Sequence, residues 1–167
     1  MGLSEDLCGI LAAGVEKERK AHEIYVAAAE KTSHPLGKKM FRRLAEEETK
    51  HEQLLASWAS QGVCPAVSGP APADKDWLAR QLAKVAAAEK PNAGDLEAIE
   101  LGRQMELKSI QFYTDCAAKA PDPPSKGLFL RLKGEEDKHL AMLTDLYEFM
   151  ANPGVWQTRE GRAHFDS

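Results

Sequence analysis

The chain has 167 residues, of which 43% are hydrophobic and 29% charged, as expected for a single globular domain. Its net charge of −4 at pH 7 argues against binding to nucleic acid or to an anionic membrane surface. The sequence contains neither an apolar run of the ~20 residues that cross a membrane nor a recognisable signal peptide, so we expect a cytoplasmic protein.

Three cysteines, Cys8, Cys64 and Cys116, are scattered along the chain. Their odd number and wide spacing are typical of neither a disulfide framework nor a zinc site. We therefore expect three free thiols and a reducing compartment, in agreement with a cytoplasmic location.

The first two predicted elements are long helices joined by a short turn. Ser4 is a suitable N-cap for a helix over Glu5–Lys31. Residues 32–34 break this helix, and a second one runs from Pro35 to about Ser60. Because the turn is short, these helices should pack as antiparallel neighbours.

A long crossover should follow this first hairpin. Residues 62–73 are rich in glycine and proline, which predicts an extended linker, and residues 74–90 predict a minor helix that ends at residues 91–94. We interpret residues 62–94 as the connection to a second hairpin that starts at the far end of the bundle.

Two further helices and a tail complete the predicted architecture. Asp95 should cap a third helix over residues 95–119. After a proline-rich stop, a fourth helix should begin at Ser125 and end near Asn152. The tail over residues 153–167 carries large aromatic side chains and should fold back on the bundle.

A Glu-x-x-His motif occurs in both the second and the fourth helix. Glu48 and His51 stand 88 residues before Glu136 and His139. The same offset relates Glu18 to Glu106 and Tyr25 to Tyr113 on the first and third helices. The repeat predicts two similar helical hairpins that close into one bundle over residues 1–152.

Helical spacing places Glu48 and His51 on one stripe with Leu44 and Leu55, which should face the core. A buried carboxylate without a partner is costly, or its pKa rises until it is neutral. A bound metal cation removes this conflict.

The four inner stripes together present four carboxylates and two imidazoles, the ligand set of di-iron and di-manganese carboxylate bundles. Two divalent cations would neutralise the four carboxylates. Oxygen and imidazole ligands suit iron, manganese or zinc, and redox use favours iron. Twofold symmetry suggests that Glu48 and Glu136 bridge the metals, with Glu18 and Glu106 as terminal ligands.

Three other residues on these stripes have alternative interpretations. The hydroxyls of Tyr25 and Tyr113 either hydrogen-bond a ligating carboxylate or belong to simple aromatic core fillers. His22 is one turn from Glu18, but its counterpart in the repeat is Ile110, so we interpret it as a core-edge histidine rather than a ligand.

A basic strip lies on the outer face of the second helix and consists of Lys38, Lys39, Arg42 and Arg43. We interpret this basic strip as a solvated surface rather than a docking patch.

The segments EKERKAHEIY, FRRLAEEETKH, MELKSIQFY and FLRLKGEEDKH resemble the four helices of the rubrerythrin branch of the ferritin-like superfamily. The resemblance covers nearly the whole chain and implies an all-α, ferritin-like four-helix bundle. Rubrerythrins are non-haem di-iron proteins that reduce hydrogen peroxide to water with an electron donor. The resemblance implies that two iron ions are bound by Glu18, Glu48, His51, Glu106, Glu136 and His139.

Two features depart from the rubrerythrin pattern. The C-x-x-C pairs of a rubredoxin domain are missing from the sequence, so we expect an external electron donor such as a rubredoxin. Ser109 stands where rubrerythrins usually carry a further Glu, which makes the ligand set more like that of bacterioferritin.

Two classes of function follow from this resemblance. One is an oxidoreductase that reduces hydrogen peroxide or dioxygen in the response to oxidative stress, and the other is ferritin-type iron oxidation and storage. A third, an oxygenase acting on an organic substrate, would need a wide pocket that the stripes do not indicate. We also expect a homodimer, because family members commonly pair.

Overall fold

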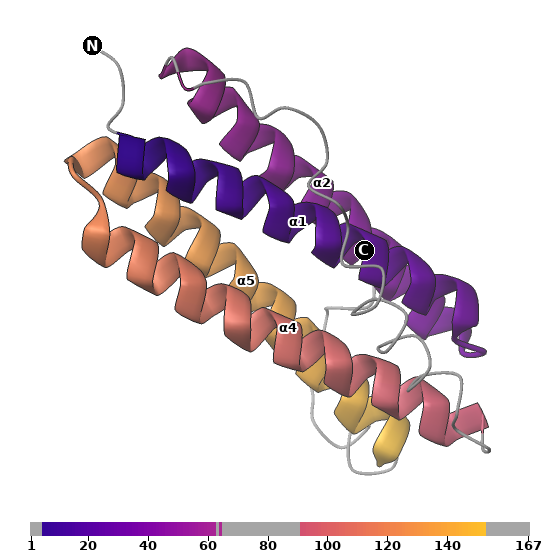
Figure 1. Cartoon of the computed structure of the whole chain (residues 1–167). Coiled ribbons are helices and arrows are strands. Elements are labelled where there is room, and N and C mark those ends of the chain that lie inside the picture. Colours follow the sequence, from indigo (N-terminus) through magenta and orange to yellow (C-terminus); the bar gives the residue numbers. More distant parts are fainter. Residues whose placement is uncertain (1–4, 63, 65–90, 153–167) are drawn as a thin grey trace.

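The structure, a computed structural model, describes residues 5–62, 64 and 91–152. Within these residues four long helices form a bundle (Figure 1). The helices are α1 (Glu5–Lys31), α2 (Pro35–Gln61), α4 (Pro91–Lys119) and α5 (Pro123–Ala151). The pair α1 and α2 packs as one hairpin and the pair α4 and α5 as another, which confirms the predicted all-α four-helix bundle of two hairpins.

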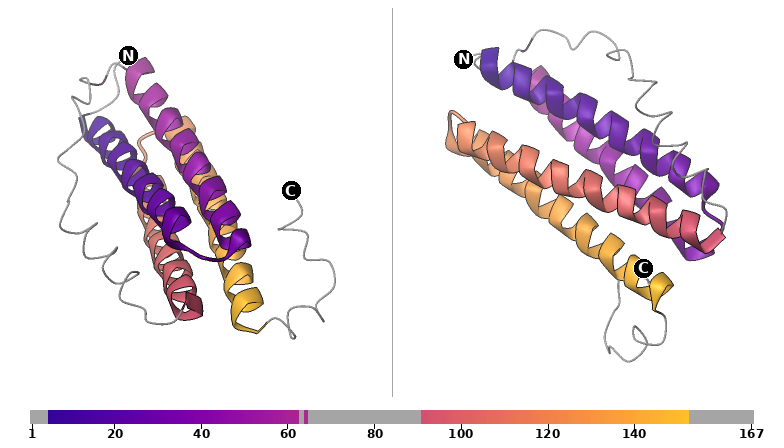
Figure 2. Two further views of the ribbon diagram at one scale, coloured as in Figure 1. Left: turned by 90° about the vertical axis from the view of Figure 1, so that its right-hand side faces the viewer. Right: turned by 60° about the horizontal axis from the view of Figure 1, so that its bottom comes forward.

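The order of the helices explains why a long connection is needed. Ser33, just after α1, contacts Asp95 near the start of α4, whereas Cys64, just after α2, is bonded to Cys8 near the start of α1. The chain therefore leaves α2 at one end of the bundle and enters α4 at the other (Figure 2). A helix of 27 residues is ~40 Å long, and the connection must span that length. The predicted minor helix over 74–90 and the tail over 153–167 lie outside the described residues.

Two helices begin earlier than the sequence predicted. α4 begins at Pro91 rather than at Asp95, and α5 begins at Pro123 rather than at Ser125. Residues 91–94 therefore belong to α4 and not to the crossover. Proline has no N–H group, but the first N–H groups of a helix have no partner within it, so proline is well tolerated in the first turn.

From the sequence we expected Asp95 to cap α4. Instead, its side chain forms hydrogen bonds that connect the two hairpins. It is buried, and its carboxylate accepts hydrogen bonds from Thr32 Oγ1, from Ser33 N at 3.1 Å and from Ser33 Oγ at 2.9 Å. This carboxylate therefore satisfies donors in the turn between α1 and α2 from the opposite hairpin.

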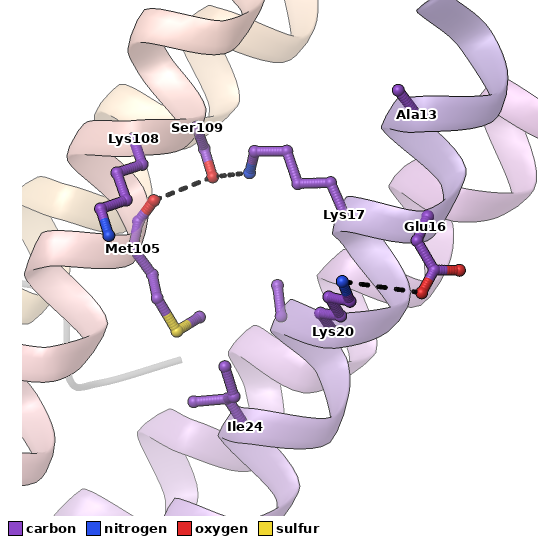
Figure 3. Close-up of a pocket in the computed structure, with 9 residues that line it drawn as sticks. Ala13, Glu16, Lys17, Lys20, Ile24, Met105, Lys108 and Ser109 are labelled. Atoms are coloured by element: carbon purple, nitrogen blue, oxygen red, sulfur yellow. Dashed lines mark hydrogen bonds and ion pairs between the residues drawn. The ribbon is translucent and has the colours of Figure 1, made fainter. Parts of the chain in front are cut away.

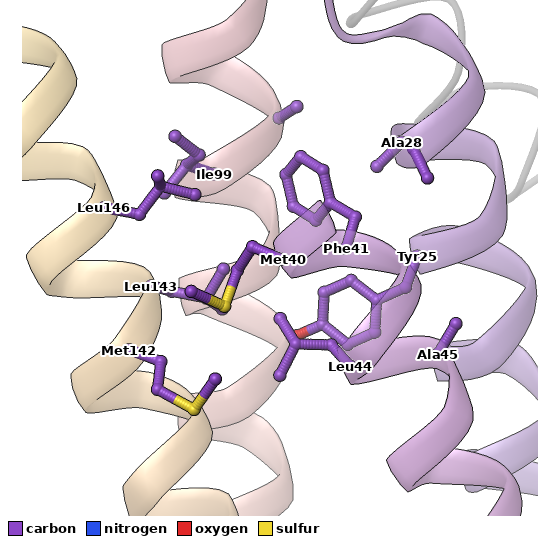
Figure 4. Close-up of a cluster of buried hydrophobic side chains, with 12 residues drawn as sticks. Tyr25, Ala28, Met40, Phe41, Leu44, Ala45, Ile99, Met142, Leu143 and Leu146 are labelled. Atoms are coloured by element: carbon purple, nitrogen blue, oxygen red, sulfur yellow. The ribbon is translucent and has the colours of Figure 1, made fainter. Parts of the chain in front are cut away.

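Two apolar clusters fill the bundle on either side of its middle. Tyr25 stacks on Phe41 in one cluster, with 6.1 Å between ring centroids (Figure 4). Tyr113 stacks on Phe129 in the other at 6.4 Å, so the aromatic pair recurs with the 88-residue offset. These clusters lie on the two sides of the polar side chains described below.

Glycine allows close packing within each hairpin at two equivalent positions. A Cβ atom at Gly14 would lie 2.9 Å from Leu55 Cδ1, and one at Gly102 would lie 3.1 Å from Leu143 Cδ1. Both contacts are tighter than ordinary van der Waals contact, so a side chain at either glycine would force the facing leucine to shift. Both the glycines and the leucines are 88 residues apart.

The prediction of three free thiols was wrong, because Cys8 and Cys64 form a disulfide with their Cα atoms 5.5 Å apart. The pairing joins residues 56 apart in sequence, which only the folded hairpin brings together. Cys116 is free and buried, and burial raises the pKa of its thiol to about 11. The expected cytoplasmic location loses the support of free thiols and stays a prediction. No helix of the described residues is long and apolar enough to span a membrane.

We expect the Cys8→Ser variant to lose about 2–4 kcal/mol of unfolding free energy, because the disulfide restricts a long loop of the unfolded chain. Urea denaturation without reductant measures this loss. Dithiothreitol should lower the wild type to the value of the variant and leave the variant unchanged. Equal stability of variant and wild type without reductant would contradict the prediction.

Candidate metal centre

Every helix contributes a carboxylate to the middle of the bundle, and α2 and α5 each add an imidazole. All six residues are buried, with at most 2% of the surface of each residue exposed. They are Glu18, Glu48, His51, Glu106, Glu136 and His139. The prediction that these six side chains converge in the core is therefore confirmed.

The donor atoms form two overlapping sets, and in each set they lie within 4.8 Å of one another. One set consists of Glu18, Glu48, His51 and Glu136. The other consists of Glu48, Glu106, Glu136 and His139. Glu48 and Glu136 belong to both sets, which is the position that bridging ligands occupy. The cluster can hold a metal, and its shared carboxylates suit a pair of ions.

Several buried atoms of the cluster have no hydrogen-bond partner among the described residues. They are Glu18 Oε2, Glu106 Oε2, both carboxylate oxygens of Glu136 and His139 Nδ1. Two of these atoms, His139 Nδ1 and Glu136 Oε2, lie 3.0 Å apart at ion-pair distance but do not form a hydrogen bond. Buried polar atoms without a hydrogen bond are rare because each costs free energy. Carboxylate oxygen and imidazole nitrogen are both good ligands of divalent cations, so bound metal would satisfy these atoms together.

Without metal, protons neutralise two of the carboxylates. Burial raises the pKa of Glu106 to about 8. Burial, together with the negative charges of Glu48 and Glu136, also raises the pKa of Glu18 well above its ordinary value. At neutral pH these two side chains are therefore carboxylic acids in the metal-free protein.

The imidazoles carry protons as well. Burial by itself would lower the pKa of His51, but its contacts with Glu136 and Glu48 outweigh burial and raise the pKa to about 11. The pKa of His139 is raised in the same way. These imidazolium ions in turn keep the pKa of Glu48 and Glu136 below the ordinary value despite burial. The metal-free cluster is thus neutral only because it holds four protons.

Two tyrosines bind the carboxylates that belong to only one set. Tyr25 on α1 donates a hydrogen bond to Glu106 on α4, and Tyr113 on α4 donates one to Glu18 on α1. Both tyrosines are completely buried, and burial and the nearby carboxylate raise the pKa of each hydroxyl, which therefore keeps its proton. Of the two interpretations from sequence, the structure supports the carboxylate contact.

Two carboxylates that were not predicted from the sequence contact the histidines from outside the cluster. His51 Nε2 lies 2.6 Å from Glu135 Oε2, and His139 Nε2 lies 2.8 Å from Glu47 Oε2. Each of these glutamates comes from the opposite hairpin. Such contacts fix the orientation of an imidazole, and its other nitrogen, here Nδ1, faces the carboxylates of the cluster, where it would be available to a bound metal. The available signal was the single glutamate directly before each Glu-x-x-His motif, Glu47 and Glu135, which recurs at the 88-residue offset.

His22 lies outside the cluster, as predicted. Its Nδ1 is 2.8 Å from the carbonyl oxygen of Ala45 and 3.0 Å from Thr49 Oγ1. Both contacts lie between α1 and α2, so His22 has a structural role at the edge of the core.

A cavity of about 390 Å³ lies between α1 and α4, beside Ser109 (Figure 3). Lys17 Nζ donates a hydrogen bond to Ser109 Oγ, and this hydroxyl donates to the carbonyl oxygen of Met105 at 3.0 Å. Ser109, the residue that departs from the rubrerythrin pattern, therefore accepts a hydrogen bond from a lysine. The helix stripes did not indicate this cavity.

A four-helix bundle of two hairpins, with a buried cluster of carboxylates and imidazoles that can hold metal, defines a class of helical metal-binding proteins. Residues 9–147 match the family model described as Rubrerythrin, and the chain belongs to the rubrerythrin family. It is also similar to the solved structure of a hypothetical protein from Pyrococcus furiosus. The two are 25% identical with a TM-score of 0.66, over 87% of this chain and 90% of that chain. No protein with a curated description matches the sequence.

Proposed function

We propose that this protein is a non-haem di-iron oxidoreductase that reduces hydrogen peroxide, or dioxygen, with electrons from an external donor. The observation that carries the proposal is the pair of overlapping donor sets that share Glu48 and Glu136. Membership of the rubrerythrin family favours iron over manganese or zinc. The proposed ligands of the two ions are Glu18, Glu48, His51, Glu106, Glu136 and His139.

When bound, the ferrous pair supplies two electrons and the Lewis acidity that peroxide reduction requires. Reduction of one hydrogen peroxide to two waters also consumes two protons. The hydroxyls of Tyr25 and Tyr113 keep their own protons, and each donates a hydrogen bond that holds a proposed terminal ligand in position. The aromatic stacks around both tyrosines fix these hydroxyls in place.

Stopped-flow spectroscopy on the anaerobic, ferrous-loaded protein tests this function. We expect hydrogen peroxide to oxidise the iron much faster than dioxygen does at the same concentration. The Glu136→Gln variant, treated in the same way, should lack the fast phase because a shared ligand is changed. Oxidation by dioxygen that is as fast as oxidation by peroxide would contradict a peroxidase.

Ferritin-type iron oxidation and storage is the second candidate. It is favoured by Ser109, which bonds to Lys17 and leaves the cluster with six ligand residues rather than seven. Addition of many ferrous ions per chain in air distinguishes the two functions. Growth of an iron mineral inside a large assembly supports storage, whereas uptake that stops at two ions per chain supports the oxidoreductase.

The remaining proposals concern partners and location. We propose that the protein forms a homodimer, takes electrons from a separate donor such as a rubredoxin, and acts in the cytoplasm. Light scattering of the metal-loaded protein measures the mass of the assembly. A monomer would contradict the proposed dimer.

A further inference from the structure

We propose that the α2/α5 side of the bundle is the docking face for a small acidic electron-transfer protein, which reduces the metal centre through the outer edges of His51 and His139. The inference rests on the proposed function, because a redox centre that takes electrons from a separate donor needs a surface on which that donor docks. It adds the place where the partner binds and the charge that the partner carries.

A hollow of about 440 Å³ opens between α2 and α5 directly over the two histidines. The imidazoles of His51 and His139 lie at its floor, together with Glu47 and Glu135. Four cationic side chains also line the hollow: Arg43, Lys50, Arg131 and Lys138. Arg43 and Arg131 are 88 residues apart in sequence, as are Lys50 and Lys138. The repeat therefore places equivalent cationic side chains on α2 and α5, and we call these four residues the cationic edge.

The hollow connects the buried cluster to solvent through a short series of hydrogen-bond contacts. The histidine side chains are 3% and 1% exposed, but those of Glu135 and Glu47, which they contact, are 32% and 29% exposed. Each imidazole thus lies 2.6 or 2.8 Å from the carboxylate of a glutamate that is partly exposed in the hollow. On the α1/α4 side, the carboxylates of the cluster contact completely buried tyrosines instead.

The charge on this face is opposite to that of the whole chain. The protein carries a net charge of −4. The hollow continues along α2 into a second one, where the basic strip and Lys50 outnumber the carboxylates of Glu46 and Glu47. From sequence the basic strip was predicted to be a solvated surface, but in the structure it adjoins the hollow over the histidines, because both hollows are lined by Arg43 and Lys50. Lys50 and Lys138 are exposed, where an incoming surface can reach them.

The arrangement fits an acidic protein better than a small anion. The cations extend over several turns of α2 and across to α5, which is larger than one small anion can contact. The carboxylates of Glu47 and Glu135, which also line the hollow, disfavour a small anion that enters it. An acidic protein surface can contact the cationic edge while it remains above these carboxylates. Complementary charge of this kind accelerates association and makes it sensitive to salt.

The kinetic test uses the iron-loaded, oxidised protein and a reduced acidic rubredoxin as the probe. The Lys50→Glu/Lys138→Glu variant should be reduced ten- to a hundredfold more slowly than the wild type at low ionic strength, and the difference should shrink as salt is added. The matched control is Lys20→Glu/Lys108→Glu, which makes the same change of charge on the α1/α4 side and should be reduced at the wild-type rate. Equal rates for all three proteins, or equal loss in both variants, would overturn the proposal.

Two further measurements separate this proposal from the proposed function. Reduced methyl viologen, a small cation, should reduce both variants and the wild type without loss of rate, which shows that the centre itself is intact. Amide NMR titration of the zinc-loaded protein with oxidised rubredoxin should shift resonances of α2 and α5 and not those of the outer faces of α1 and α4. Shifts on α1 and α4 alone, or no binding, would overturn the docking face even if the iron chemistry is as proposed. If the charge-reversal variant does not fold, Lys50→Gln/Lys138→Gln provides the same comparison with a smaller expected effect.

Discussion

Substitution of Glu136 by glutamine should weaken the binding of both metal ions, whereas substitution of Glu18 should affect only one. Glu136 belongs to both donor sets, and Glu18 belongs to one of them. Loss of a charged ligand shared by two cations removes attraction from each of them. We therefore expect Glu136→Gln to retain less than one ion per chain under conditions in which Glu18→Gln retains one and the wild type retains two.

Metal analysis after dialysis at a fixed free metal concentration measures this difference, and far-ultraviolet circular dichroism shows whether each variant is folded. Glu135→Gln is a useful comparison because Glu135 contacts His51 Nε2 but belongs to neither donor set. It should keep both ions with an affinity that is lower by about 10–100-fold. Retention of both ions by Glu136→Gln at wild-type affinity would contradict its bridging position.

Metal uptake should release about four protons per chain at pH 6, so affinity should rise steeply with pH. In the metal-free protein the pKa of His51 is raised to about 11 and that of Glu106 to about 8, and those of His139 and Glu18 are also raised. A group with a raised pKa holds its proton at pH 6, and a metal ion must displace that proton to bind. Each proton released makes binding tighter as the pH increases.

Calorimetric titration of the metal-free protein with zinc, in two buffers of different ionisation enthalpy, measures the number of protons released. The number should fall as the pH is raised through 8, since Glu106 then ionises before metal binds. Release of no protons at pH 6 would contradict the protonation that the structure indicates for the metal-free cluster.

The six side chains of the buried cluster could be predicted from the sequence because the two hairpins repeat the same pattern of residues. A single Glu-x-x-His motif is common on helix surfaces, but the 88-residue repeat identifies Glu48 and Glu136 as equivalent positions on inward stripes. The same repeat predicted that Tyr25 and Tyr113 play equivalent parts. Helical periodicity was therefore enough to predict both the four-helix fold and the convergence of the six side chains.

The contacts that the sequence did not reveal join the two hairpins or the ends of helices. Glu47 lies beside Glu48 in sequence and looks like an ordinary solvated glutamate, because its partner His139 comes from the other hairpin. Asp95 has the residue type of a helix cap, but it binds the turn after α1 instead. The Cys8–Cys64 disulfide likewise depends on how α1 and α2 pack. Periodicity identifies which face of a helix is buried, but not which atoms of another element meet it.

The most direct test of the account is the anomalous X-ray scattering of crystals grown with iron under anaerobic conditions. We expect two iron peaks in the middle of the bundle, one beside His51 and one beside His139, with Glu48 and Glu136 in contact with both. A single peak, or peaks only on the surface while the six side chains pair among themselves, would contradict a two-metal centre.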